Sequence, residues 1–197
     1  AAAQRAVALA FSSLNDKRAY ESWKKYSELP GVVENEGYEI SRVLYNGGYF
    51  IECIEILNLL KTEKPGDEEI LELMARAHYS LENWEECYEI SNELAGVSPE
   101  NLTGLRLRMR ALRNLEDKIG VKVSAEKLLE SKSHDEEAIR HLIQHSASVG
   151  DWGAVEDFTR IAIENSDLKE HTLRWHARAL VRQGKDAREA WGRLLKK

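Results

Sequence analysis

Two successive segments of the chain share one pattern: residues 34–67 read ENEGYEISRVLYNGGYFIECIEILNLLKTEKPGD, and residues 68–101 read EEILELMARAHYSLENWEECYEISNELAGVSPEN. Cys53 and Cys87 lie 34 residues apart, and each is followed twelve residues later by a proline, Pro65 or Pro99. A fixed period of this length is typical of proteins built from stacked helical units. The repeat therefore decides the fold class before any single residue is considered.

Each segment is expected to form two amphipathic helices, because its apolar residues recur at steps of three and four. In residues 34–67 the first helix should end at Asn46-Gly47-Gly48, and the second should end before Pro65, which lacks an amide hydrogen. The next segment should turn near residues 82–84. We expect the later hairpins to turn at Gly120, at Gly150-Asp151-Trp152 and at Gln183-Gly184.

These hairpins predict an all-α solenoid formed by one repeat domain over residues 1–197. A single hairpin cannot bury its apolar face, whereas stacked hairpins bury a continuous seam and leave a concave and a convex surface. The expected units, about five to six in number, are approximately 1–33, 34–67, 68–101, 102–135, 136–169 and 170–197.

The composition limits the classes of function. Charged residues make up 31% of the 197 positions and hydrophobic residues 43%, with 3 Pro and 12 Gly, so a disordered or collagen-like chain is excluded. A net charge of -6 argues against a uniformly basic nucleic-acid binder. Without an apolar run of about 18 residues, no membrane insertion is expected. Cys53 and Cys87 should be reduced, which is compatible with a cytoplasmic location.

The chain resembles the tetratricopeptide repeat (TPR) family. The resemblance rests on the 34-residue period, the Gly150-Asp151-Trp152 turn, the unit-final Pro65 and Pro99, and a small residue in each second helix: Ala19, Cys53, Cys87 and Ala125. It implies a right-handed solenoid of antiparallel hairpins. It also implies that the first helix of each hairpin lines the concave surface, chiefly through positions 2, 5, 9, 12 and 13 of the unit.

Arginine dominates those positions. Position 5 holds Tyr38, Glu72, Arg106, Arg140 and Arg174; position 9 holds Arg42, Arg76, Arg110, Gln144 and Arg178; Arg113 and Arg182 follow one turn later. Residues four apart share a helix face, so stacked helices would present a ladder of guanidinium groups. Tyr45 and Tyr79 could add stacking or hydroxyl contacts. The alternative is that nearby glutamates such as Glu69, Glu72 and Glu137 neutralise these arginines; it is favoured for Arg42 and Arg76, and the ladder is favoured in the later units.

The predicted function is that of a non-catalytic interaction scaffold whose arginine-lined groove binds an acidic, extended segment of a partner protein. The alternative is an accessory repeat domain of a larger enzyme or assembly that handles an anionic polymer, such as an acidic glycan or nucleic acid. The carboxylate clamp known in the TPR family is not matched, because Tyr38, Arg42 and Leu73 occupy its positions.

Other side chains point to no further chemistry. His141 and His145 lie one helical turn apart, but Leu142 replaces the glutamate of a zinc-protease motif and no third ligand is apparent. Trp175 is expected in the core, with contact to a ligand as the less favoured alternative. The sequence therefore predicts no catalytic residue, no metal site and no cofactor.

Overall fold

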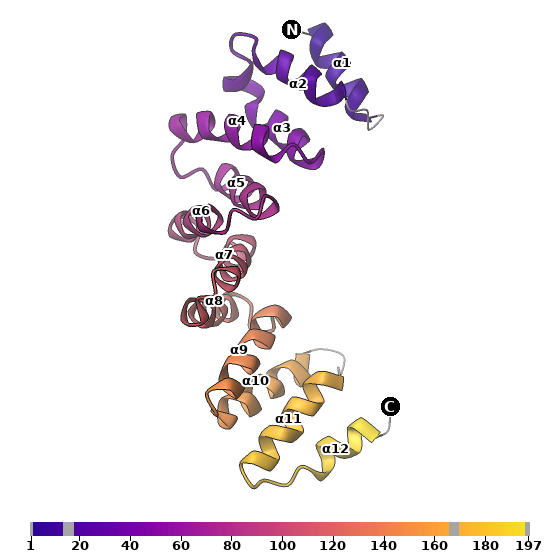
Figure 1. The fold of residues 1–197 in the computed structure, drawn as a ribbon, viewed down its shortest axis with the longest axis vertical. Coiled ribbons are helices and arrows are strands. Elements are labelled where there is room, and N and C mark those ends of the chain that lie inside the picture. Colours follow the sequence, from indigo (N-terminus) through magenta and orange to yellow (C-terminus); the bar gives the residue numbers. More distant parts are fainter. Residues whose placement is uncertain (1, 14–17, 166–169, 196–197) are drawn as a thin grey trace. The chain divides into compact units, whose positions relative to one another are not determined.

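The computed structural model describes residues 2–13, 18–165 and 170–195, and every regular element in these ranges is an α-helix (Figure 1). The first helices of the hairpins are α1 (Ala2–Ser13), α3 (Val32–Asn46), α5 (Glu68–Ser80), α7 (Leu102–Asn114), α9 (Glu136–Ser148) and α11 (Glu170–Arg182). The second helices are α2 (Arg18–Ser27), α4 (Phe50–Glu63), α6 (Trp84–Val97), α8 (Lys118–Ser131), α10 (Trp152–Asn165) and α12 (Arg188–Leu195). The predicted all-α repeat fold is confirmed.

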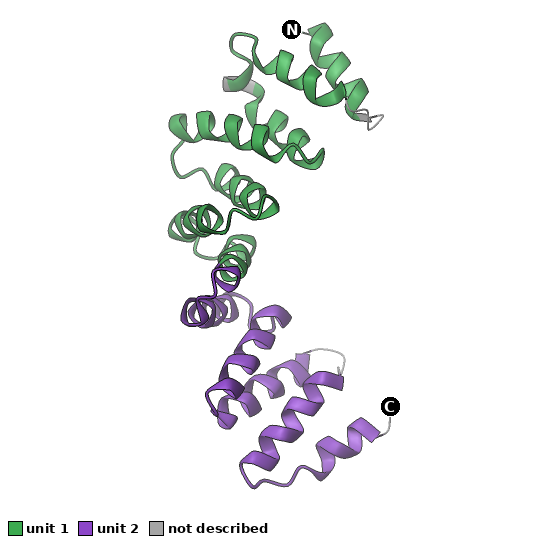
Figure 2. Ribbon diagram, viewed as in Figure 1, with its two compact units in different colours: residues 1–111 green, residues 112–197 purple. Residues whose placement is uncertain are grey.

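The chain divides into two compact units, residues 1–111 and residues 112–197, which are coloured separately in Figure 2. In the first unit, helices that follow one another along the chain pack together from α1 to α6, and α3 also contacts α5. In the second unit the same holds from α8 to α12. Each unit is therefore a stack of helix hairpins, and the single domain predicted over 1–197 stays a prediction.

One residue with left-handed backbone lies in each hairpin turn from the second hairpin onward, and it recurs every 34 residues. The φ angles are 82° at Gly48, 60° at Glu82, 60° at Glu116, 78° at Gly150 and 70° at Gly184. Glycine adopts this conformation without steric cost, whereas glutamate does not. The backbone geometry of the turn is thus the same in all five hairpins, although at Glu82 and Glu116 the residue is one that disfavours it.

The prediction that the hairpin of α7 and α8 turns at Gly120 is wrong. The turn lies at Glu116, and Gly120 lies in the first turn of α8, where its amide donates to the Asp117 carboxylate at 2.9 Å. With the turn at Glu116, Val121 rather than Ala125 is equivalent to Cys53 and Cys87. Ala125 is nevertheless fully buried, one helical turn later.

Side chains also cap the first helices at intervals of 34 residues. The Asp67 carboxylate accepts from the amides of Glu69 and Ile70 at the start of α5, and Asp135 accepts from Glu137 and Ala138 at the start of α9. Between them, Asn101 Oδ1 accepts from the Gly104 amide at 2.7 Å, near the start of α7. Such caps satisfy amides that have no partner within the helix.

The core lies between the hairpins and is formed by residues at equivalent positions of the 34-residue repeats. Cys53, Cys87 and Val155 follow the turn residue at the same distance, and all three are fully buried. Burial raises the pKa of the Cys53 thiol to about 12 and that of Cys87 to about 11. Both cysteines are free thiols, as predicted.

Membrane insertion finds no support in the described helices, none of which is both long and apolar enough to span a bilayer.

Candidate functional site

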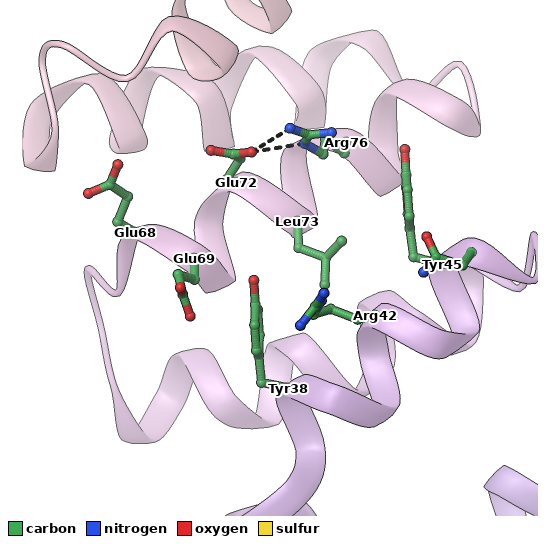
Figure 3. A pocket seen from close by; sticks show the side chains of 9 residues that line it. Tyr38, Arg42, Tyr45, Glu68, Glu69, Glu72, Leu73 and Arg76 are labelled. Atoms are coloured by element: carbon green, nitrogen blue, oxygen red, sulfur yellow. Dashed lines mark hydrogen bonds and ion pairs between the residues drawn. The ribbon is translucent and has the colours of Figure 1, made fainter. Parts of the chain in front are cut away.

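An open pocket of about 640 Å³ lies between the first helices α3 and α5 in the first unit (Figure 3). Its walls are Tyr38, Arg42, Tyr45 and Asn46 from α3 and Glu68, Glu69, Glu72, Leu73 and Arg76 from α5. These residues include the predicted positions 5 and 9 of two successive 34-residue repeats, and position 12 of the first of them, Tyr45. The pocket therefore lies on the helices that were expected to line the groove, although it carries more carboxylates than guanidinium groups.

The two arginines of this pocket are paired within the chain. Arg76 donates to the Glu72 carboxylate from both Nε and Nη2, at 3.0 and 2.6 Å. Arg42 donates from Nη1 to Glu39 at 3.2 Å. These contacts match the alternative that the sequence favoured for both residues.

The remaining candidates of the first unit are partly buried. The Arg110 guanidinium carbon lies 6.0 Å from the centroid of the Tyr79 ring, and that ring packs edge-on against Trp84. Tyr45 packs at a tilt against Phe50, with ring centroids 5.4 Å apart. Arg106 is half-buried on α7. In this unit the predicted stacking tyrosines thus contact neighbouring side chains of the chain itself.

A second pocket, of about 230 Å³, lies between α9 and α11 in the second unit. The lining residues are Glu136, Ile139, Arg140, Ile143, Gln144, Ala162, His171, Thr172 and Trp175. Ile139 and Ile143 are buried and Trp175 is partly buried against them, so an apolar floor lies beside polar and charged rims. Trp175 thus both packs against the core and lines this pocket, and its contact with a ligand stays a prediction.

The arginines of the second unit differ from those of the first in their partners. Arg113, Arg140, Arg178 and Arg182 are exposed, and none of them forms an ion pair or hydrogen bond with any residue in the described ranges. Arg178 and Arg182 instead lie over aromatic rings, 5.5 Å from the centroid of Trp175 and 5.4 Å from that of Trp152. Arg174 is the exception, because its guanidinium pairs with Glu170.

The nine predicted arginines thus form two groups. The first unit holds Arg42, Arg76, Arg106 and Arg110, and the second holds Arg113, Arg140, Arg174, Arg178 and Arg182. A guanidinium ladder that runs through both units stays a prediction. Glutamate pairs are shown for Arg42 and Arg76 in the first group and for Arg174 in the second, whereas Arg113, Arg140, Arg178 and Arg182 pair with no carboxylate of the described residues.

His141 and His145 are half-buried and belong to no metal-binding arrangement among the described residues. Burial, together with the charge of Arg113, lowers the pKa of His141. Within the described ranges, no group of three His, Cys, Asp or Glu side chains is placed to hold a metal ion.

Sequence reasoning missed two features of these pockets. Asn101 Nδ2 donates to Glu68 Oε1 and to Glu72 Oε2, at 2.8 Å each, and so fixes two carboxylates of the first pocket. The signal was available, since Asp67, Asn101 and Asp135 are spaced by 34 residues in the sequence. The apolar floor under Trp175 had no comparable signal, because it depends on how α9 and α11 pack.

Comparison with known proteins supports the fold. No family model and no curated protein matches the sequence. Among solved structures, a tetratricopeptide repeat protein from Parabacteroides merdae matches with a TM-score of 0.65 and 18% identity over 96% of this chain and 75% of that chain. The MamA protein matches with a TM-score of 0.70 and 12% identity over 84% of this chain and 92% of its own.

A third similar structure contains a peptide. The first TPR domain of Spaghetti (RPAP3), bound to the HSP90 peptide SRMEEVD, matches with a TM-score of 0.53 and 18% identity over 58% of this chain and 90% of that chain. Identities this low establish the fold alone. The chain is a TPR-like helical repeat.

Proposed function

We propose that this TPR-like chain is a non-catalytic interaction domain that binds an acidic, extended segment of a partner protein along α9 and α11. The observation that carries the proposal is the set of exposed arginines on these helices that lack a carboxylate partner among the described residues. A similar fold holds an extended peptide in the Spaghetti complex, which supports this class of ligand.

The guanidinium groups are suited to carboxylates. Arg140 lies on α9 and lines the pocket, while Arg174, Arg178 and Arg182 follow one another at steps of four on α11. A guanidinium group stays charged and can donate two parallel hydrogen bonds to one carboxylate. Arg178 is held over the Trp175 ring, so less freedom is lost when it binds a ligand.

The pocket supplies the apolar part of the contact. Ile139, Ile143 and Trp175 form its floor, and its volume of about 230 Å³ suits one large apolar side chain. Burial of such a side chain contributes about 1.5–3 kcal/mol. We therefore expect the partner segment to place a leucine-sized or aromatic residue beside its acidic residues.

A binding experiment tests the charge requirement. A labelled peptide with a central leucine flanked by glutamates should bind the full chain, and a version with lysines in place of the glutamates should not. In the variant Arg140→Gln/Arg178→Gln the dissociation constant of the acidic peptide should rise at least tenfold, since two charge-assisted contacts are lost. Fluorescence anisotropy at fixed salt measures both constants.

The matched control is Arg160→Gln/Arg193→Gln, which removes two exposed arginines from α10 and α12 that do not line this pocket. Equal weakening in both variants would contradict the proposal. The anionic-polymer alternative predicts a different outcome: affinity for a polyanion should rise with its length and fall steeply with salt, and short acidic peptides should compete poorly.

A further inference from the structure

We propose that the pocket between α3 and α5 is a second, separate binding site that takes a lysine or arginine side chain of an extended segment of a partner protein. The site has the opposite charge preference from the α9–α11 pocket and does not depend on the function proposed above. It is carried by a large open pocket, two uncompensated carboxylates at its rim and a tyrosine wall (Figure 3).

The charges of the pocket leave an excess of negative charge. Glu72 pairs with Arg76 at 2.6 Å, and Arg42 pairs outside the pocket with Glu39. Glu68 and Glu69 form no ion pair with any residue of the described ranges. An anionic ligand would meet these two carboxylates while both arginines are already engaged, so a cation is favoured.

One of the two carboxylates is fixed in place before any ligand binds. Asn101 donates from Nδ2 to Glu68 Oε1 and Glu72 Oε2, and its own Oδ1 accepts from the Gly104 amide. Asn101 is therefore held at both ends of its side-chain amide. A fixed acceptor loses less conformational entropy on binding than a mobile one. The Glu68 carboxylate can therefore accept a hydrogen bond from a lysine or arginine side chain at a lower entropic cost.

Tyr38 forms the wall that a long cationic side chain needs. In Figure 3 it rises from α3 with its hydroxyl directed toward α5, next to Glu69. Burial raises the pKa of Tyr38, and the charges of Glu69, Glu72 and Asp67 add to the rise, while the charge of Arg42 opposes it. The negative field of the carboxylates thus reaches the tyrosine. Its ring and Leu73 offer apolar surface to the methylene groups of lysine or arginine.

The position of the pocket indicates a protein segment as the source of the cation. The pocket is open, about 640 Å³ in volume, and lies along the first helices, the surface that the repeat architecture leaves free for extended ligands. A side chain anchored on a bound main chain fills such a pocket with little additional entropic cost.

The test uses the full chain and a labelled peptide that carries one lysine between neutral residues, with the acidic peptide described above as a second probe. In Glu68→Gln/Glu69→Gln the dissociation constant of the lysine peptide should rise at least tenfold. The matched control is Glu85→Gln/Glu86→Gln, which removes two exposed carboxylates from the first turn of α6. Circular dichroism and thermal melts check that both variants fold.

Three outcomes would overturn the assignment: unchanged binding in Glu68→Gln/Glu69→Gln, equal loss in the control, or displacement of the peptide by spermidine at the concentration of the peptide itself. Tyr38→Leu should also raise the dissociation constant of the lysine peptide and leave that of the acidic peptide unchanged. Binding of the acidic peptide should be weakened by Arg140→Gln/Arg178→Gln and not by the glutamate variants. Either of the two proposed sites can therefore be contradicted without the other.

Discussion

At the residue scale, the left-handed position of the hairpin turn shows how one backbone requirement recurs along the chain. Gly150 has a φ of 78°, and a Cβ placed there would meet no atom within 4 Å. Glu116 meets the same requirement with a side chain, at a φ of 60°. Substitutions at these two positions can therefore measure the free-energy cost of the left-handed backbone with little contribution from packing.

Reciprocal substitutions measure this cost. Gly150→Ala should lower the free energy of unfolding by about 1–2 kcal/mol, because the left-handed conformation disfavours any Cβ. Glu116→Gly should raise it by up to about 1 kcal/mol, since relief of the same strain is partly offset by the greater freedom of glycine in the unfolded chain. Urea unfolding followed by circular dichroism measures both.

A matched control for these variants is a substitution at an exposed glycine whose φ is not positive. Gly153, in the first turn of α10, is suitable because a Cβ there would lie 3.6 Å from its nearest neighbour, the Asp151 carboxylate. Gly153→Ala should therefore not destabilise the chain. Destabilisation by Glu116→Gly would contradict the strain argument.

At the scale of the helix, the caps explain where the first helices begin. Asp67 and Asp135 each accept hydrogen bonds from two amides of the helix that follows, at 3.0–3.2 Å. Asp135 is also buried, with 3% of its surface exposed. A buried cap combines satisfaction of amides with a favourable charge at the positive end of the helix dipole.

Removal of the Asp135 cap should therefore destabilise the second unit. Asp135→Ala leaves two amides of α9 without their acceptor, and we expect a loss of about 1–2 kcal/mol. Asp135→Asn retains the acceptor oxygen and should lose less. Thermal melts of the two variants beside the parent chain make the comparison, and equal losses for Ala and Asn would show that the charge rather than the hydrogen bonds stabilises α9.

The helices and their pairing could be predicted from sequence because the repeat fixes both. The hairpin turns at Gly48 and Gly150 were predicted correctly, since glycine marked them. The turn at Glu116 was not predicted, because its left-handed residue is a glutamate and the nearest glycine, Gly120, lies in α8. A strict count of 34 residues from Glu82 finds it.

The candidate sites were less predictable than the helices. The sequence placed arginines on the first helices, but it could not decide which of them would find a carboxylate. Arg76 pairs with Glu72 because the two lie four residues apart on one helix face, whereas Arg140 has Glu136 at the same spacing and forms no ion pair with it. Such differences depend on rotamers and on neighbouring helices.

At the scale of the whole molecule, the net charge of -6 describes neither pocket. The first unit has two carboxylates without cationic partners at the α3–α5 pocket, and the second unit has arginines without anionic partners on α9 and α11. Local pairing determines what each pocket attracts, because exposed charges farther apart than about 8–10 Å are screened at physiological salt.

The whole molecule should also lose stability in mild acid. Burial lowers the pKa values of three half-buried histidines, His78, His141 and His176. The unfolded chain binds these protons near pH 6.5, whereas the folded chain resists them. The stabilisation is therefore complete above about pH 6.5 and is lost as the pH falls through the lowered values. The urea midpoint should decrease between pH 7 and pH 5, a range that lies above the ordinary titration of carboxylates.

Variants assign this dependence to buried imidazoles. His141→Gln should flatten the decrease of the urea midpoint between pH 7 and pH 5, because one group that titrates differently in the two states is removed. His134→Gln is the matched control, since His134 is exposed and its side chain is not enclosed by neighbouring helices. A midpoint that stays constant or rises as the parent chain is acidified would contradict the sign of the effect, because a lowered histidine pKa can only make unfolding take up protons.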